Sequence, residues 1–310
     1  MKLCCVIGGC GFIGRHLVEL LLQTGRQVRV IDTLPAAAAG FAPQVEYLRN
    51  PGADKDFLKK ALKAADEVVD LAYATVPKTS FDEPLRDIRS NLPFGLELFQ
   101  AAGNSSVRKL IVLSSGGTVY GEPLKLPISE LHPTNPVSPY GITKLAMEKY
   151  ALMFHHLNAL PVVILRPGNA FGEGQRAFSG QGFVATAMAS FLQGKAVTVF
   201  GRHGTVRDYV YVKDIASGIV AVLAKGKVGA CYNLGSGRGY TNRQVLEAIV
   251  PLARKAGLKP KIVFAAARKF DVSANILDSS KLATATGWKA RTAFKEGVAS
   301  TWAWFLQNCK

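Results

Sequence analysis

The sequence predicts an α/β fold with a doubly wound parallel sheet and a smaller C-terminal lobe. Three observations support this prediction. Short apolar runs alternate with amphipathic stretches over the first third of the chain, a glycine-rich turn follows the first run, and the alternation ends near Gly172. The predicted strands are almost continuously apolar, which is typical of a sheet that helices cover on both faces.

Hydrophobic periodicity gives the order of the elements. Leu3–Ile7 is the first predicted strand, Ile13–Gln23 the first helix and Gln27–Ile31 the second strand. Pro35–Gly40, which is rich in alanine, is predicted as a loop. The other predicted elements are the strands Glu67–Leu71, Leu110–Leu113 and Val162–Leu165 and the helices Leu92–Ala102 and Tyr140–Asn158.

Composition limits the class of protein. The chain has 310 residues, 48% of them apolar, which is enough to bury a full core. No run approaches the roughly 20 apolar residues of a membrane span, and the chain enters the glycine turn without a signal-peptide pattern, so we expect a soluble, cytoplasmic protein without a membrane partner. Five cysteines without C-x-x-C spacing and scattered histidines predict neither disulfides nor a metal site.

The formal net charge of +16 allows two interpretations. A basic surface could bind nucleic acid or a substrate that carries a diphosphate, and composition alone does not separate them. The Lys and Arg residues are scattered and form no single run. We therefore expect no nucleic-acid partner.

A dinucleotide-binding motif lies between the first strand and the first helix. The sequence Gly8-Gly9-Cys10-Gly11-Phe12-Ile13-Gly14 contains G-x-G-x-x-G, in which glycines let backbone N–H groups approach a pyrophosphate. Asp32 ends the second strand about 20 residues on, where a carboxylate accepts hydrogen bonds from the ribose hydroxyls and repels a 2′-phosphate. The pattern predicts a Rossmann-like domain that binds NAD in preference to NADP. The alternative is that Asp32 only caps the strand.

A second motif supplies candidate catalytic groups. Tyr140 and Lys144 in Ser138-Pro139-Tyr140-Gly141-Ile142-Thr143-Lys144 are four residues apart, on one face of the helix that they begin. The ordinary pKa of a phenol is about 10, but a nearby ammonium group and the positive nicotinamide ring would both lower it. We therefore expect Tyr140 to act as a general base toward a sugar hydroxyl.

With both motifs in place, the sequence resembles the extended short-chain dehydrogenase/reductases, within them the NAD-dependent epimerase/dehydratase family and its UDP-glucose 4-epimerase-like group. The resemblance covers nearly the whole chain. It includes the segments GGCGFIG, SSGGTVYG (Ser114–Gly121), SPYGITK, LRPGNAFG (Leu165–Gly172), VRDYVYVKDIA (Val206–Ala216) and YNLGSG (Tyr232–Gly237).

The resemblance implies a division of the chain and a set of site residues. Residues 1–171 would form the NAD-binding domain and 172–310 mostly a substrate-binding lobe, with segments of about 205–235 returning to the main domain. The apolar runs Val220–Leu223 and Ala230–Leu234 could rejoin the main sheet. The implied cofactor-binding residues are Gly8, Gly11, Phe12, Ile13, Gly14, Asp32, Asn91, Tyr140 and Lys144, and the implied substrate-binding residues are Asn169, Arg207 and Arg268.

Departures from the family pattern bear on the reaction. Gly116 stands where the epimerases usually carry a serine that hydrogen-bonds the sugar, so Thr118 or Ser115 would supply that hydroxyl, with Thr118 preferred. Gly117 and Thr118 also replace the Asp-Glu pair of the dehydratases. An elimination would lack its proton carriers. Epimerisation and simple ketone reduction remain.

The leading interpretation is C4 epimerisation of a UDP-hexose through a 4-keto intermediate, with Tyr140 as acid/base. The alternative enzyme is a reductase of a nucleotide-activated 4-keto-sugar, and a different class is an inactive family member that serves as a regulator. The resemblance also implies a homodimer built from the helices that contain Asn91 and Tyr140. Apolar Ile142, Leu145, Leu152 and Leu157 agree with this. Asn275 lies roughly where family members accommodate the substituent at C2 of the sugar.

Overall fold

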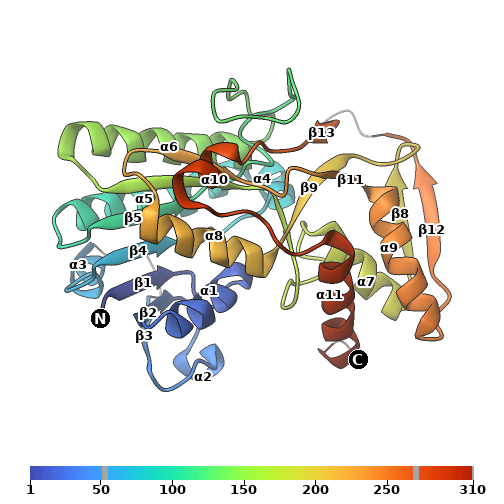
Figure 1. Ribbon diagram of the computed structural model, residues 1–310, viewed down its shortest axis with the longest axis horizontal. Coiled ribbons are helices and arrows are strands. Elements are labelled where there is room, and N and C mark those ends of the chain that lie inside the picture. Colours follow the sequence, from blue (N-terminus) through green and yellow to red (C-terminus); the bar gives the residue numbers. More distant parts are fainter. Residues whose placement is uncertain (51–54, 268–271, 309–310) are drawn as a thin grey trace.

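The computed structural model describes residues 1–50, 55–267 and 272–308. Its main element is a parallel sheet of seven strands in the order β10-β6-β5-β4-β1-β2-β3 (Figure 1). The order reverses between β1 and β4, as in doubly wound nucleotide-binding folds. These strands are β1 (Leu3–Ile7), β2 (Gln27–Asp32), β3 (Val45–Arg49), β4 (Glu67–Asp70), β5 (Lys109–Leu113), β6 (Val162–Pro167) and β10 (Cys231–Leu234).

Helices cover both faces of this sheet, as the apolar strands predict. One face packs against α1 (Phe12–Gln23) and α8 (Val212–Lys225), and the other packs against α3 (Lys55–Ala61), α5 (Pro84–Gly103) and α6 (Pro139–Asn158). Alternate residues of β1 divide between the two cores, with Cys4 and Val6 in one and Cys5 and Ile7 in the other. The shorter helices are α2 (Ala36–Ala39), α4 (Pro77–Asp82) and α10 (Ser280–Thr286).

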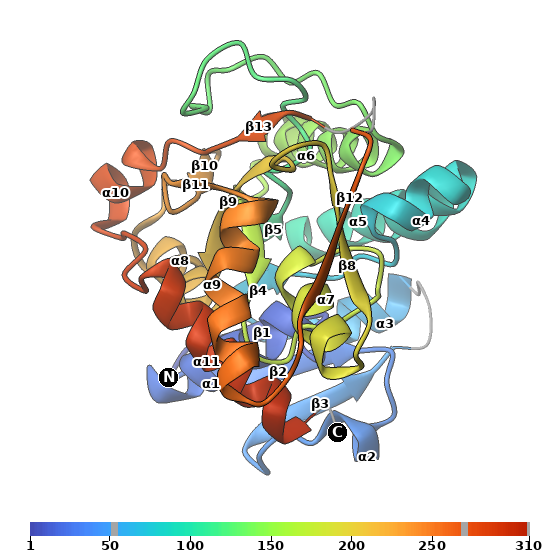
Figure 2. The same cartoon turned by 90° about the vertical axis from the view of Figure 1, so that its right-hand side faces the viewer.

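A smaller lobe stands beyond the carboxyl edge of the sheet in Figure 1, and Figure 2 shows the molecule from the side of this lobe. The strands β7 (Asn169–Phe171), β9 (Val206–Tyr211), β11 (Gly239–Thr241) and β13 (Ala274–Asn275) form one small sheet, and β8 (Ala196–Phe200) pairs with β12 (Lys261–Ala265). The helices α9 (Asn242–Lys255) and α11 (Phe294–Asn308) pack on the small sheet, and α7 (Phe183–Leu192) packs against both helices and against β8. Their shared core is rich in aromatic rings, among them Phe171, Tyr209 and Phe294.

The element predictions hold for most of the first domain. The structure has all the predicted strands and helices, and α5 begins eight residues before the predicted Leu92. The strand β3 was not predicted because it lies at the sheet edge and its polar residues interrupt the apolar run. Cys231–Leu234 joins the main sheet as β10, but Val220–Leu223 is no strand: it lies inside α8, whose apolar side packs on the sheet.

The sequence predicted a loop for the alanine-rich segment after β2. This prediction was wrong for part of the segment. Its four alanines form the single helical turn α2, which Gly40 ends with a φ of +64°. Alanine has the highest helix propensity of the amino acids, and a left-handed glycine is a common end of a helix.

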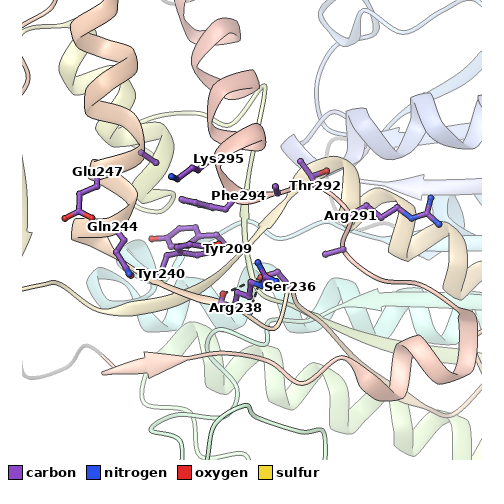
Figure 3. A pocket seen from close by; sticks show the side chains of 13 residues that line it. Tyr209, Ser236, Arg238, Tyr240, Gln244, Glu247, Arg291, Thr292, Phe294 and Lys295 are labelled. Atoms are coloured by element: carbon purple, nitrogen blue, oxygen red, sulfur yellow. Dashed lines mark hydrogen bonds between the residues drawn. The ribbon is translucent and has the colours of Figure 1, made fainter.

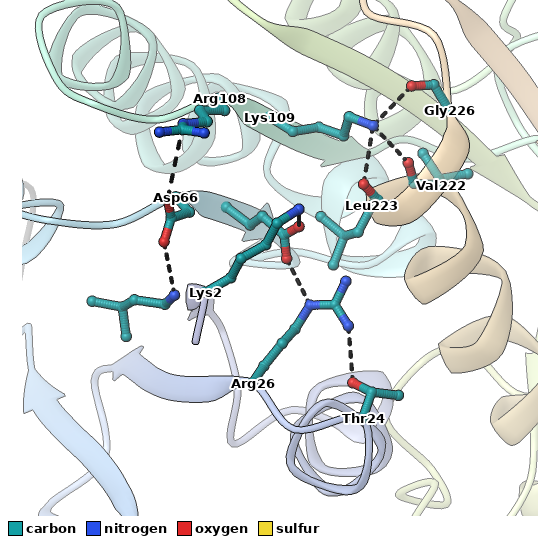
Figure 4. A network of polar contacts seen from close by, with 11 residues as sticks. Lys2, Thr24, Arg26, Asp66, Arg108, Lys109, Val222, Leu223 and Gly226 are labelled. Carbon is teal, nitrogen blue, oxygen red and sulfur yellow. Dashed lines mark hydrogen bonds and ion pairs between the residues drawn. The ribbon is translucent and has the colours of Figure 1, made fainter.

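Buried ionic contacts fix the amino ends of the central strands (Figure 4). Glu67, with a side chain only 2% exposed, accepts hydrogen bonds from Lys2 at 3.0 Å and from Arg26 at 2.7 Å. Lys109 donates to the carbonyl oxygens of Val222, Leu223 and Gly226, where α8 ends. An ammonium group at the C-terminus of a helix satisfies its free carbonyls and complements its dipole. The candidate site lies at the opposite edge of the sheet, at the carboxyl ends of the strands.

Candidate functional site

A cavity of about 690 Å³ opens at the carboxyl edge of the sheet, beside the point where the strand order reverses. Its walls come from the segments that follow β1, β2 and β4, from α5, and from residues 173–181. In doubly wound folds this crevice is where nucleotides bind. Of the predicted cofactor-binding residues, Gly8, Gly11, Phe12, Asp32 and Asn91 line the cavity.

The glycine turn has the close backbone packing that the motif predicts. Gly8 has a φ of +77°, which a residue with a side chain rarely adopts. A Cβ at Gly14 would lie 2.5 Å from the carbonyl oxygen of Gly8, so only glycine lets α1 begin this close to the turn. Ile13 does not reach the cavity and packs against the core below it. The turn thus directs the amino end of α1 at the cavity, which favours a phosphate there.

Asp32 lies at the same opening. Its carboxylate accepts hydrogen bonds from the backbone N–H of Cys10 and of Thr33, both at 2.8 Å. These bonds hold the carboxylate between the glycine turn and the end of β2, and they leave lone pairs for the two hydroxyls of a ribose. Asn50 also lines the cavity. The glycine cradle, the carboxylate and the cavity together fit a dinucleotide without a 2′-phosphate.

Asn91 acts on the far wall of the cavity through its amide. Its Oδ1 accepts from the backbone N–H of Ala74 at 2.9 Å, and its Nδ2 donates to the carbonyl of Asp87 at 2.7 Å. Thr75 makes a short hydrogen bond to the carboxylate of Asp87. These buried contacts tie the segment after β4 to α5. Asn91 therefore shapes the cavity wall by fixing the backbone there.

Tyr140 and Lys144 lie near the start of α6, whose first turn is capped by Ser138. The Lys144 ammonium donates to the carbonyl of Leu113 at 2.8 Å and lies over the ring of Tyr73, 3.9 Å from its centroid. The ring of Tyr140 meets the Tyr73 ring edge to face at 4.9 Å. Tyr73 thus stands between the two residues of the motif and contacts both.

Burial changes the acidity of these groups. It lowers the pKa of Lys144 to about 8, against the attraction of Asp70, Glu148 and Asp87. Burial also raises the pKa of Tyr140, and the charge of Asp87 adds to the rise. The direction is opposite to the lowering that we expected from Lys144, whose Nζ is 5.8 Å from the Tyr140 ring centroid. Desolvation of the phenolate outweighs that attraction, so a lower pKa would depend on the positive ring of the cofactor.

The loop after β5 brings the candidate hydroxyls to the start of α6. A Cβ at Gly141 would lie 2.8 Å from the carbonyl oxygen of Thr118, so the residue after Tyr140 is packed against this loop. The Thr118 Oγ1 is buried and has no hydrogen-bond partner among the described residues. Asn169 is close, since its Oδ1 would lie 3.3 Å from a Cβ at Gly117. Ser115 is half-buried in the same turn.

Close packing explains why residue 116 is a glycine. A Cβ there would lie 2.6 Å from Cδ1 of Leu277 and 2.9 Å from the carbonyl oxygen of Arg166, so a serine does not fit. Asn275 donates from Nδ2 to the carbonyl of Gly116 at 2.9 Å, while its Oδ1 is buried without a partner among the described residues. The loss of the family serine thus accompanies tight packing of residues 275–277 on the loop.

Arg207 and Arg268 were predicted to bind the substrate, and only Arg207 lies within the described residues. Arg207 lies on β9, where it pairs with Asn275 of β13 and donates to the carbonyls of Val206 and Val272. Its guanidinium is therefore positioned by backbone oxygens. Arg268 lies outside the described residues.

Asp70 and Tyr73 are among the residues of the cavity wall that sequence reasoning missed. Both belong to the segment Asp70-Leu71-Ala72-Tyr73 at the carboxyl end of β4, an edge where functional side chains gather in parallel sheets. Burial raises the pKa of Asp70 to about 6, although Lys144 and the N–H of Ala72 oppose the rise. Their position at a strand end was the available signal.

Comparison with known proteins decides the family. The model of the NAD-dependent epimerase/dehydratase family matches residues 4–235. The chain belongs to this family. UDP-glucose 4-epimerase of Mycolicibacterium smegmatis is 32% identical over 307 residues, which cover 97% of each chain.

Solved structures match the fold of this chain over its whole length. UDP-glucose 4-epimerase of Thermotoga maritima with UDP-glucose has a TM-score of 0.92 and 31% identity, and UDP-glucose 4-epimerase of Thermus thermophilus in complex with NAD has a TM-score of 0.89 and 34% identity. Each match covers 100% of both chains. The family, the Rossmann-like fold and NAD as the cofactor are thereby confirmed. Among the described residues, no helix is both long and apolar enough to cross a membrane.

Proposed function

We propose that this member of the family epimerises C4 of a UDP-hexose through a 4-keto intermediate, with Tyr140 as the acid/base. The observation that carries the proposal is the contact between Thr118 and Gly141, which joins the residue after Tyr140 to residues 115–118, a segment without a carboxylate. The only side-chain hydroxyls of residues 115–118 are those of Ser115 and Thr118. Residues 115–118 therefore offer hydrogen bonds to a sugar but no acid for elimination of water.

Different residues of the chain would bind different parts of NAD. Gly8, Gly11 and Phe12 would hold the pyrophosphate side of NAD, Asp32 the adenosine ribose, and Lys144 the nicotinamide ribose. Bound there, NAD supplies an acceptor and later a donor for the hydride of the sugar carbon.

The proton is handled by the protein. Tyr140 takes the proton of the C4 hydroxyl as the ketone forms and returns one to the ketone oxygen as the inverted alcohol forms. Thr118, or Ser115, donates to or accepts from the same sugar oxygen. Lys144 remains protonated below a pH of about 8 and favours the phenolate through its charge.

The relatives support a UDP-sugar. The Mycolicibacterium smegmatis and Thermotoga maritima proteins are named UDP-glucose 4-epimerases, and a third structural relative, from Methanobrevibacter ruminantium M1 with a TM-score of 0.90 and 29% identity, is a UDP-N-acetylglucosamine 4-epimerase. Asn169 and Arg207 are the residues that we assign to substrate contact. The cytoplasmic location remains part of the proposal, because these nucleotide sugars would be its substrates.

We further propose a homodimer that pairs α5 and α6 of two copies. The outer faces of these adjacent helices expose apolar side chains, including Ile88, Ile142, Met153 and Leu157, whose exposed fractions range from 42% to 67%. Leu145, by contrast, packs inward on the cluster around Val119. A particle of twice the chain mass of 33.3 kDa in light scattering is expected, and Ile142→Lys with Leu157→Lys should give a monomer. A monomeric wild type would refute the dimer.

The function is tested by incubating the purified protein, without reductant, with UDP-glucose, UDP-N-acetylglucosamine and UDP-glucuronate in separate reactions. Chromatography that resolves C4 epimers should show interconversion of at least one sugar, lost in Tyr140→Phe. No interconversion with any of them, together with NADPH oxidation on a nucleotide-activated 4-keto-sugar, would favour the reductase instead.

A further inference from the structure

A second cavity, also of about 690 Å³, lies in the small lobe between α9, the start of α11 and the segment that leads into β11 (Figure 3). It shares no lining residue with the cofactor cavity, and neither Tyr140, Thr118 nor Asn169 contributes to it. None of the roles assigned above uses it. Its walls combine aromatic rings with cationic side chains, which is the composition of a site for a planar anion.

The aromatic wall is built around Phe294. The rings of Tyr240 and Phe294 stack with their centroids 4.2 Å apart and an interplanar angle of 19°. Tyr209 packs on the same ring with a centroid distance of 5.7 Å. Because Phe294 covers one face of Tyr240, the ring meets the cavity with its other face or its edge. Such a surface can stack on a nucleobase.

Tyr209 supplies a polar group at the base of the cavity. The residue is only 5% exposed, yet it lines the cavity. Burial raises the pKa of Tyr209, opposed by the charge of Arg207, so the hydroxyl keeps its proton and can donate or accept. A phenol hydroxyl in the wall of a cavity can therefore form a hydrogen bond with a ligand there.

Positive charge gathers at the rim. The cavity is lined by Arg238 and by Lys295, and Lys295 belongs to the first turn of α11. Neither side chain forms an ion pair among the described residues, whereas the one carboxylate that lines the cavity, Glu247, pairs with Arg243 at 3.1 Å. The amino end of a 15-residue helix adds its dipole to these cations. Arg291 also contributes to the lining, but Figure 3 shows its guanidinium pointing away from the aromatic group.

We propose that this second cavity binds a nucleoside monophosphate, with the base against Tyr240, a base or ribose group on the Tyr209 hydroxyl, and the phosphate between Arg238, Lys295 and the start of α11. The cavity has a direct link to the candidate substrate site, because Tyr209 of β9 pairs in register with Asn169 of β7. The inference does not depend on which reaction the enzyme catalyses.

Hydrogen exchange measured by mass spectrometry on the NAD-loaded protein tests this, because it reports where a ligand binds. The probes are UMP, AMP, uridine and inorganic phosphate. At least one nucleotide should slow exchange in peptides that cover residues 236–241 and 291–297, and it should do so more than uridine or phosphate alone. Protection of the glycine turn or of the loop after β5 reports the other site and is scored separately.

Matched variants assign the contacts. Arg238→Ala with Lys295→Ala should weaken nucleotide binding at this cavity by at least about tenfold, as expected for lost charge-assisted hydrogen bonds. Tyr209→Phe, which keeps the ring, should weaken it by about threefold to tenfold, and Arg291→Ala should leave it unchanged. The proposal is overturned if no nucleotide protects these peptides, if phosphate alone protects them equally, or if Arg291→Ala weakens binding as much as the double variant.

Discussion

The ammonium group of Lys144 lies 3.9 Å from the centroid of the Tyr73 ring. This cation–π contact and the hydrogen bond to the carbonyl of Leu113 fix the end of a long side chain beside Tyr73, which lines the cofactor cavity. Tyr73 also packs edge to face on Tyr140. One ring outside the SPYGITK motif therefore sets the relative position of its two principal residues.

Substitutions at Tyr73 should distinguish the role of the ring from that of the hydroxyl. The hydroxyl is buried and has no hydrogen-bond partner among the described residues. Tyr73→Phe keeps the contacts with Lys144 and Tyr140, so kcat should stay within about twofold and stability should not fall. Tyr73→Leu removes the ring face, and we expect kcat to fall by about tenfold. Steady-state kinetics and thermal unfolding of both variants check this. Equal kinetics in the two variants would show that the ring does not position Lys144.

Thr118 is the hydroxyl that we expect to replace the family serine. Thr118→Val keeps the shape and removes the donor, so kcat should fall by about 100-fold, while Thr118→Ser should stay within about tenfold of wild type. Ser115→Ala serves as the comparison and should cost less than about threefold. Rates measured on the sugar that the enzyme epimerises decide the matter. If Ser115→Ala is the more damaging variant, the hydroxyl role passes to Ser115.

Asp70 should make stability depend on pH in a defined window. Its pKa is raised from 3.8 to about 6 by burial, so the folded protein binds more protons than the unfolded chain between these values. Stability from this group is therefore present at low pH and is lost as pH rises from about 4 to about 6. Asp70→Asn should remove this slope and stabilise the protein at pH 7 by up to about 3 kcal/mol.

Urea unfolding at several pH values measures the effect of Asp70→Asn. The exposed Asp82 provides the control, since Asp82→Asn should leave the pH profile unchanged. A profile of Asp70→Asn that parallels that of wild type between pH 4 and 6 would show that Asp70 is not the group responsible.

Gly116 should resist restoration of the family serine. Gly116→Ala places a methyl group against Leu277 and the backbone of Arg166, and overpacking of this kind costs about 1–3 kcal/mol. Gly103→Ala is the matched control, because a Cβ there would meet only Leu160 at an ordinary 3.9 Å. Denaturant unfolding compares them. Similar midpoints for the two variants would mean that the loop after β5 adapts and that packing does not explain the glycine.

Most of the first domain could be predicted because its sequence patterns lie within short stretches of the chain. Strands buried on both faces read as apolar runs, and the glycine turn, Asp32 and the Tyr140/Lys144 spacing are fixed by backbone approach and helix geometry. The edge strand β3 lacks such a run, and Val220–Leu223 shows the limit of the method: a buried helix segment and a buried strand share the same apolar pattern.

The site was only partly predictable because several of its features depend on tertiary contacts. Tyr73 belongs to no motif, and its role arises where β4 ends beside α6. The raised pKa of Tyr140 follows from burial, which sequence spacing does not reveal. The packing of Leu277 on Gly116 joins residues more than 150 positions apart, so the reason for the missing serine could be found only in the folded chain.

The central claim is that Tyr140 and bound NAD epimerise C4 by internal return of the same hydride. Its most direct test uses a UDP-hexose deuterated at C4, incubated with the purified protein in water without reductant. The account predicts a C4 epimer that retains deuterium at C4, and a loss of rate of at least about 100-fold in Tyr140→Phe. Deuterium lost to water during epimerisation, or an unchanged rate in Tyr140→Phe, would contradict it.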